Sequence, residues 1–199
     1  MSWFQYLIVV GAIVQLLGSL SYVKETLAGR AKPNRVTWLM WAIAPMIATV
    51  AAVVSGVTWA VLPVFTSGFG PLLVFISSFF SKKAYWKLEK FDYICGIFSV
   101  LALLLWAITK EPFIAILFAI LSDGFAAVPT LIKLWKHPET EHPSPYLTGL
   151  FSSLMSFTVI KSWAFVEVAF PIYLITVYSL LLLSFYRKKI FLKLRIKIR

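Results

Sequence analysis

The hydrophobic positions of this chain are grouped in seven long apolar runs, and each run is bounded by charged or turn-forming residues. Runs of this length predict transmembrane helices, because ~20 apolar residues span the hydrocarbon layer of a bilayer. The alternative is a set of buried core helices in a soluble protein, but seven such runs in 199 residues favour the membrane. The predicted helices cover residues 3–23, 36–55, 57–80, 91–109, 112–134, 145–160 and 163–186.

Composition supports the membrane interpretation. Hydrophobic residues make up 60% of the chain and charged residues 14%, and the mean hydropathy is +0.87. These values are far from the usage of soluble globular domains, and seven spans leave no length for a soluble domain. The amino end lacks the basic segment and the small-residue cleavage site of a signal peptide, so we expect the first helix to be retained.

Lysine and arginine gather in the connections that alternating spans place on one side of the membrane. This side holds 17 of the 19, and Lys110 and Lys161 lie on the other. Because cytoplasmic loops are rich in these residues, the amino end is predicted outside and the carboxyl end in the cytoplasm. The net charge of +11 therefore flanks a membrane and does not indicate nucleic-acid binding. The short loops and compact size suit a bacterial inner membrane.

In the basic tail, residues 189–199, apolar and basic positions alternate from Leu192 to Arg199. It is either a solvated topology anchor or an interfacial segment held by anionic lipid.

A shift of 108 residues places the first three predicted helices on the last three without a gap in the spans. The helix at 91–109 then restores the direction of the chain, so that both triplets run the same way. The fold class predicted is an all-α integral membrane protein with a 3+1+3 parallel repeat. Residues 1–86 form the first three-helix bundle, 87–111 the linker helix, 112–188 the second bundle and 189–199 the tail. The shift aligns Gln15 with Asp123, Trp38 with Tyr146, Pro63 with Pro171, Phe65 with Tyr173, and Ser21 with Pro129.

Gln15 and Asp123 lie about halfway along the first helix of each triplet, ~15 Å deep at ~1.5 Å per residue. Carboxylates inside a membrane are costly and mark solute or proton pathways, so Asp123 is a candidate proton carrier or counter-ion for a cationic solute. The structural alternative is a carboxyl group bonded to nearby hydroxyls such as Ser122, which would fix the fifth helix against the first. Glu167 lies nearer a helix end and is a secondary candidate.

Aromatic residues and prolines complete the predicted pathway. The aromatic candidates for stacking on a planar solute are Trp38, Trp41, Trp59, Phe65 and Tyr173. Trp38 and Trp59 lie near span ends, where anchoring at the membrane interface is the alternative. The candidate hinges are Pro45, Pro63, Pro129 and Pro171, with kinks for packing as the alternative.

The segment Gly18-Ser19-Leu20-Ser21-Tyr22, followed by residues 29–38 (GRAKPNRVTW), resembles the helix-one-to-two segment of PQ-loop proteins, the superfamily of the SWEET (MtN3-like) transporters. Residues 127–130 (AVPT) are similar to the proline–glutamine signature of that group. The resemblance implies alternating access by two three-helix bundles for a small polar solute. Ser21 replaces the first family proline, helix six has no internal proline, and Asn34 is the single asparagine, so the sugar-binding asparagines of that family are missing.

The predicted function is a small-solute transporter or facilitator, with Asp123 as the candidate site of proton coupling. Two alternatives remain: a vitamin carrier of the nicotinamide riboside type, and a KDEL-receptor-like receptor or scaffold that does not transport. The sequence contains no nucleophile–histidine–acid set or phosphate loop, so no enzyme and no cofactor are expected. The histidine loop at 137–142 matches no metal-ligand spacing, so no metal is expected. The partners expected are the solute, membrane lipid and a second copy of the chain.

Overall fold

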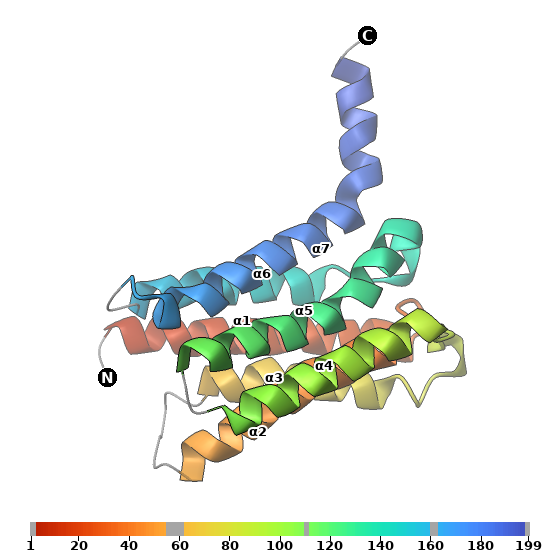
Figure 1. Cartoon of the computed structure of the whole chain (residues 1–199). Helices are drawn as coiled ribbons and strands as arrows, with labels where there is room; N and C mark the ends of the chain where they lie inside the picture. Colours follow the sequence, from red (N-terminus) through yellow and green to blue (C-terminus); the bar gives the residue numbers. More distant parts are fainter. Residues whose placement is uncertain (1–2, 55–61, 110–111, 160–162, 198–199) are drawn as a thin grey trace.

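The computed structural model describes residues 3–54, 62–109, 112–159 and 163–197, and within these ranges all regular structure is helical. Figure 1 shows the helices packed side by side as a bundle. The described α-helices are α1 (Trp3–Leu27), α2 (Arg35–Val54), α3 (Leu62–Ser77), α4 (Lys90–Ile108), α5 (Pro112–Lys136), α6 (Ser144–Ser156) and α7 (Phe165–Lys197). Short 3-10 turns are η2 (Lys82–Ala84), η3 (Pro138–Thr140) and η4 (Phe157–Val159). The predicted all-α class and its seven helices are confirmed.

Local sequence signals explain where several helices begin and end. Gly29 adopts a positive φ of 75° just after α1, a backbone conformation that glycine accepts without steric cost. The Asn34 side chain accepts hydrogen bonds from the backbone N–H groups of Val36 and Thr37 at 3.1 and 3.3 Å, which caps α2. Glu89 and Asp92 form a reciprocal capping box at the start of α4.

The end of the seventh helix differs from the sequence prediction. The prediction ended at Tyr186, whereas α7 continues as one helix to Lys197 and includes most of the basic tail. Figure 1 shows this last part bending away from the bundle. Lysine, arginine and leucine are good helix formers, so a basic cluster marks a change of polarity without ending the helix.

The packing partners of the helices define a ring. α1 packs on α3 and α6, α7 packs on α5 and α6, and α2 packs on α3 and α5. α4 lies outside this ring against α5 and α2. Each group of three helices therefore meets the other along two seams, α1 with α6 and α2 with α5. At the first seam the backbones approach closely, because a Cβ atom on Gly18 would lie 1.9 Å from Thr148 Oγ1.

Three of the described helices contain stretches long and apolar enough to cross a membrane: Tyr6–Leu27, Ile116–Lys136 and Val168–Ile190. Large apolar side chains also cover the outward face of α4, where Ile97 and Leu104 are 59% and 58% exposed. The buried core lies inside the ring and includes Tyr22, Trp38 and Tyr146. An apolar exterior around a partly polar interior is the distribution that lipid requires.

Candidate functional site

A cavity of about 470 Å³ lies within the ring of helices. That volume falls in the range of ~300–1,000 Å³ typical of small-molecule sites. Every helix of the ring contributes to its wall, and α4 does not. Six of the residues singled out from the sequence lie in this wall together: Gln15, Trp38, Trp41, Pro45, Asp123 and Pro171.

Asp123 is half-buried and is held from two sides. The Tyr173 hydroxyl on α7 donates a hydrogen bond to Asp123 Oδ2 at 2.7 Å. The Trp41 indole on α2 donates to the backbone carbonyl of Asp123 at 3.4 Å. Tyr173 is not a wall residue, and it contributes to the site through the hydrogen bond from its hydroxyl group to Asp123. The carboxylate is oriented by a neutral donor and remains in contact with the cavity.

The structural alternative for Asp123 is confirmed in that a hydroxyl group bonds to the carboxylate, but this hydroxyl is that of Tyr173 and not that of Ser122. Ser122 bonds to Ser99 on α4, with Ser99 Oγ donating to the Ser122 carbonyl at 2.8 Å and Ser122 Oγ donating to the Ser99 carbonyl at 2.9 Å. Asp123 instead connects α5 to α7. Within one turn of α5, Ser122 therefore bonds to the outer helix α4, and the next residue, Asp123, faces the cavity.

The aromatic candidates divide into three groups. Trp38 and Trp41 meet edge to face, with ring centroids 5.4 Å apart and planes at 82°, and both are buried. Trp38 also packs on Tyr22 at 4.8 Å, so it belongs to the core and does not anchor the outer surface. Phe65 stacks on Phe69 at 5.0 Å and is not a wall residue. Trp59 lies outside the described residues.

The candidate hinge prolines also differ in position. Pro45 and Pro171 lie inside α2 and α7 and line the cavity. Pro129 lies inside α5 but away from the cavity wall. Pro63 is in the first turn of α3 as described, and the internal proline of that helix is Pro71, another wall residue. A proline cannot donate to the carbonyl four residues earlier, so Pro45 and Pro71 leave the carbonyls of Trp41 and Ser67 without a helical N–H donor.

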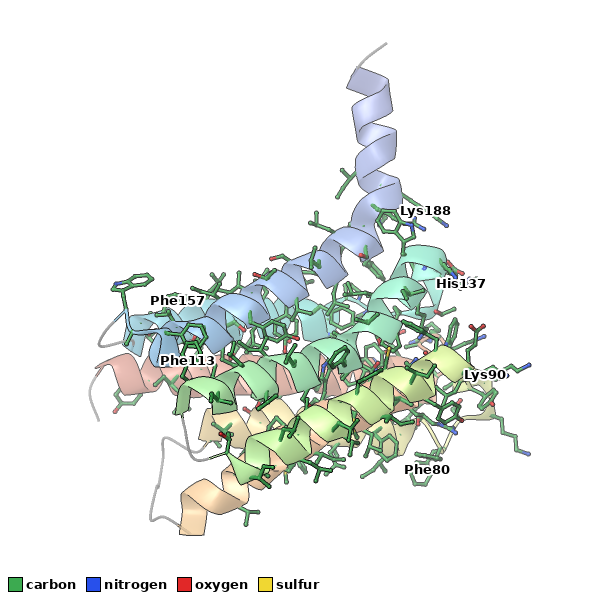
Figure 2. The ribbon with its side chains drawn as sticks, viewed as in Figure 1. Phe80, Lys90, Phe113, His137, Phe157 and Lys188 are labelled. Carbon is green, nitrogen blue, oxygen red and sulfur yellow. The ribbon has the colours of Figure 1, made fainter. Side chains whose placement is uncertain are left out.

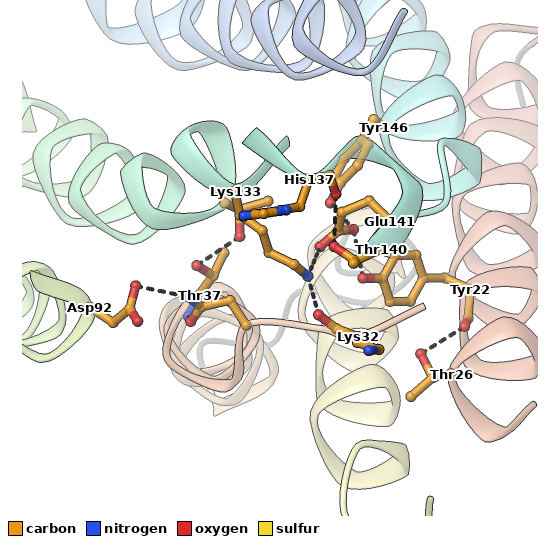
Figure 3. A network of polar contacts seen from close by, with 12 residues as sticks. Tyr22, Thr26, Lys32, Thr37, Asp92, Lys133, His137, Thr140, Glu141 and Tyr146 are labelled. Atoms are coloured by element: carbon orange, nitrogen blue, oxygen red, sulfur yellow. Dashed lines mark hydrogen bonds and ion pairs between the residues drawn. The ribbon is translucent and has the colours of Figure 1, made fainter. Parts of the chain in front are cut away.

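A buried polar network, which the sequence prediction missed, adjoins the cavity through Tyr146 (Figure 3). Glu141 accepts hydrogen bonds from the hydroxyls of Tyr22 at 2.6 Å and Tyr146 at 2.9 Å. Lys133 Nζ lies 2.6 Å from Glu141 Oε1, and the two side chains are only 1% and 0% exposed. Lys133 also donates to the backbone carbonyl of Lys32. Because Tyr146 lines the cavity as well, this network forms its floor.

The floor connects the two groups of three helices. Tyr22 and Lys32 come from the first group, whereas Lys133, Glu141 and Tyr146 come from the second. A second connection is made at the α2–α5 seam, where Thr37 Oγ1 donates to the Ala126 carbonyl at 2.7 Å and accepts from Thr130 Oγ1 at 3.0 Å.

Part of this network could have been found in the sequence. Lys133 falls within an apolar helical run, and a buried lysine needs a compensating carboxylate. Glu141 is one of only eight acidic residues, which limits the choice of partner. From the sequence, Lys133 is one of the 17 basic residues predicted on the cytoplasmic side, and Glu141 lies in the histidine loop at 137–142. Among the residues that the structure describes, no group of three or more possible metal ligands occurs.

Comparison of the chain with family models, curated proteins and solved structures found no match.

Proposed function

We propose that this chain is a seven-span membrane transporter for a small polar solute, working by alternating access. The observation that carries the proposal is the shared cavity: Gln15 from α1 and Asp123 from α5 line one space of about 470 Å³ inside the ring. A midplane site between two helix bundles is the usual arrangement in transporters with repeated halves. The buried floor at Glu141 supports a state that is closed at one end.

The proposed 3+1+3 repeat is supported by the order of packing. Exchanging α1 with α5, α2 with α6 and α3 with α7 maps the contacts of the ring onto one another. The α1–α3 contact corresponds to α5–α7, and the α2–α5 seam corresponds to the α6–α1 seam. α4 has no counterpart in this exchange, as a linker helix requires. The relationship supports a duplicated bundle.

The proposed orientation has the amino end outside and the carboxyl end in the cytoplasm of a bacterium. Figure 2 supports it, because Lys90, His137 and Lys188 lie toward one end of the bundle, while Phe113 and Phe157 lie toward the other. The floor of the cavity lies toward the Lys90 end, where the 28–34 connection meets η3 through a hydrogen bond from Lys32 N to Thr140 O of 2.8 Å. The cytoplasmic side would therefore be the closed side.

Solute flux in proteoliposomes tests this proposal. Purified protein would be screened by counterflow with panels of small cations, neutral polar compounds and amino acids, with protein-free vesicles as the blank. Saturable flux is expected for at least one class. Asp123→Asn should abolish any uptake driven by a pH gradient, because an amide cannot exchange a proton; Tyr173 and Tyr178 are the other titratable groups near it. The matched control is Glu139→Gln, the same change at a carboxylate that is 63% exposed.

One result would contradict transport, and another would contradict the role of Asp123. Tight capture of a peptide or protein without flux of any solute indicates a receptor. Wild-type pH-driven uptake by Asp123→Asn removes Asp123 from the coupling mechanism. The proposed lipid role of the basic tail has a separate test: a chain ending at Tyr186 should bind anionic vesicles more weakly, since each basic residue near such a surface contributes ~1 kcal/mol.

A further inference from the structure

One formally charged side chain lies in the described part of the cavity wall. Among the wall residues that the structure describes, Asp123 is charged and the others are apolar, hydroxyl, aromatic or amide side chains. The described wall holds no lysine, arginine or histidine. An anionic solute would therefore meet a carboxylate with no described basic wall residue to attract it.

The charge of Asp123 lacks a cationic partner among the contacts that the structure describes. Its side-chain hydrogen-bond donor is the neutral hydroxyl of Tyr173. The lysine in the adjoining floor, Lys133, is already occupied by Glu141 and by the Lys32 carbonyl. Burial of an ion is expensive unless an opposite charge compensates it, so the site is electrostatically incomplete without a ligand.

The remaining groups around Asp123 suit a positive centre as well. Trp41 lies against the Asp123 backbone, and tryptophan faces attract organic cations. A neutral sugar would need several directional hydrogen bonds, but Gln15 supplies the one amide side chain in the described wall, and four of the wall hydroxyls, those of Ser19, Ser67, Ser153 and Ser156, already donate to carbonyls of their own helices.

We propose that the solute is a small organic cation, whose positive centre pairs with the Asp123 carboxylate and whose flat or methylated body packs on the neighbouring indoles. This inference rests on the proposed transport function, and it specifies the class of solute.

Pairs of probes that differ mainly in charge test the inference. Choline and 3,3-dimethyl-1-butanol have nearly the same shape, and 1-methylnicotinamide and nicotinamide form an aromatic pair. Binding to purified protein in lipid nanodiscs would be measured by titration calorimetry. At least one cation is expected to bind about tenfold or more tightly than its neutral partner. If neither cation binds more tightly than its partner, the inference is wrong.

Variants at Asp123 make the test specific. Asp123→Asn should remove the preference for the cation, and Asp123→Glu should retain it because the charge remains. Glu139→Gln should bind like the wild type, since Glu139 is exposed on η3 away from the cavity wall. A monodisperse Asp123→Asn protein that still prefers the cation would overturn the assignment to Asp123.

The outcomes separate this inference from the transport proposal. Cation preference in binding, with no flux in proteoliposomes, supports the cation site and contradicts transport. Saturable flux of a neutral compound, with no preference for either cation, supports transport and contradicts the cation site.

Discussion

Two carboxylates lie on the inner side of the helix ring, and their surroundings are opposite in kind. Glu141 is fully buried and receives a lysine ammonium and two tyrosine hydroxyls. Asp123 is half-buried, receives one tyrosine hydroxyl on its side chain and faces a cavity. A carboxylate whose partners are all supplied by the protein holds the fold together. A carboxylate that the protein bonds through one neutral hydroxyl, and that lines a cavity, is available to a ligand or a proton.

The difference also separates two parts of the helix ring, the floor and the cavity. At the floor, polar groups from both bundles satisfy one another, so separating the bundles there means breaking the hydrogen bonds from Tyr22 to Glu141, from Lys133 to the Lys32 carbonyl and from Lys32 N to Thr140 O. At the cavity, the two bundles line an open volume of about 470 Å³. Alternating access would require the floor to open, and the hydrogen bonds that cross between the two bundles there therefore stabilise the closed state.

Glu141→Gln is the change with the largest expected effect on stability. It leaves the Lys133 ammonium buried without its counter-charge, and breaking a buried pair in this way costs about 3–5 kcal/mol. The free energy of unfolding in mixed micelles, measured by titration with a denaturing detergent, tests this value. Glu139→Gln is the control and should lie within about 0.5 kcal/mol of the wild type. A loss below about 1 kcal/mol for Glu141→Gln would mean that the pair is not buried in solution.

Removing both charges should cost less than removing either one. In Lys133→Met/Glu141→Gln no unpaired ion remains, so we expect at least about 2 kcal/mol of favourable coupling in the double-mutant cycle. The same unfolding titration on the two single variants and the double variant gives this coupling. Additive losses would show that the two residues act independently and that the ion pair does not organise the floor.

The sequence predicts one of these two carboxylate sites, that of Asp123, and does not predict that of Glu141. The bilayer fixes helix length, so apolar runs predicted all seven helices, and a shift of 108 residues singled out Gln15 and Asp123, which do share a cavity. Depth along a helix follows from counting residues, and a repeat gives equivalent depths to equivalent positions.

Counting residues along the helices does not predict the floor, because the floor depends on the conformation of the connections between them. Lys133 meets Glu141 because η3 folds back under α5, and the 28–34 connection then packs on η3. Loop conformations of this kind depend on tertiary contacts that no local pattern specifies. Counting charges by side of the membrane places Lys133 on the cytoplasmic side but does not reveal that its side chain is buried, with 1% exposed.

Tyr173→Phe should have a smaller effect than the changes at the floor. It removes one hydrogen bond to a charged group, which contributes ~1.5–3 kcal/mol when buried, but Asp123 can regain water from the cavity. We expect a loss of about 1 kcal/mol in the unfolding titration. The preference for organic cations should persist, because the carboxylate keeps its charge. A variant that loses this preference would show that the hydroxyl itself binds the solute.

Asp123→Asn should change stability least, although it is chemically the same kind of change as Glu141→Gln. An asparagine oxygen can still accept a hydrogen bond from the Tyr173 hydroxyl, and no cationic partner among the described residues is left behind. We therefore expect the free energy of unfolding to shift by less than about 1 kcal/mol, in either direction, since losing an uncompensated charge offsets the weaker hydrogen bond. The pair of measurements decides the comparison: equal losses for the two variants would make Asp123 a structural residue, whereas a stable protein without cation preference or pH-driven uptake would make it a functional one.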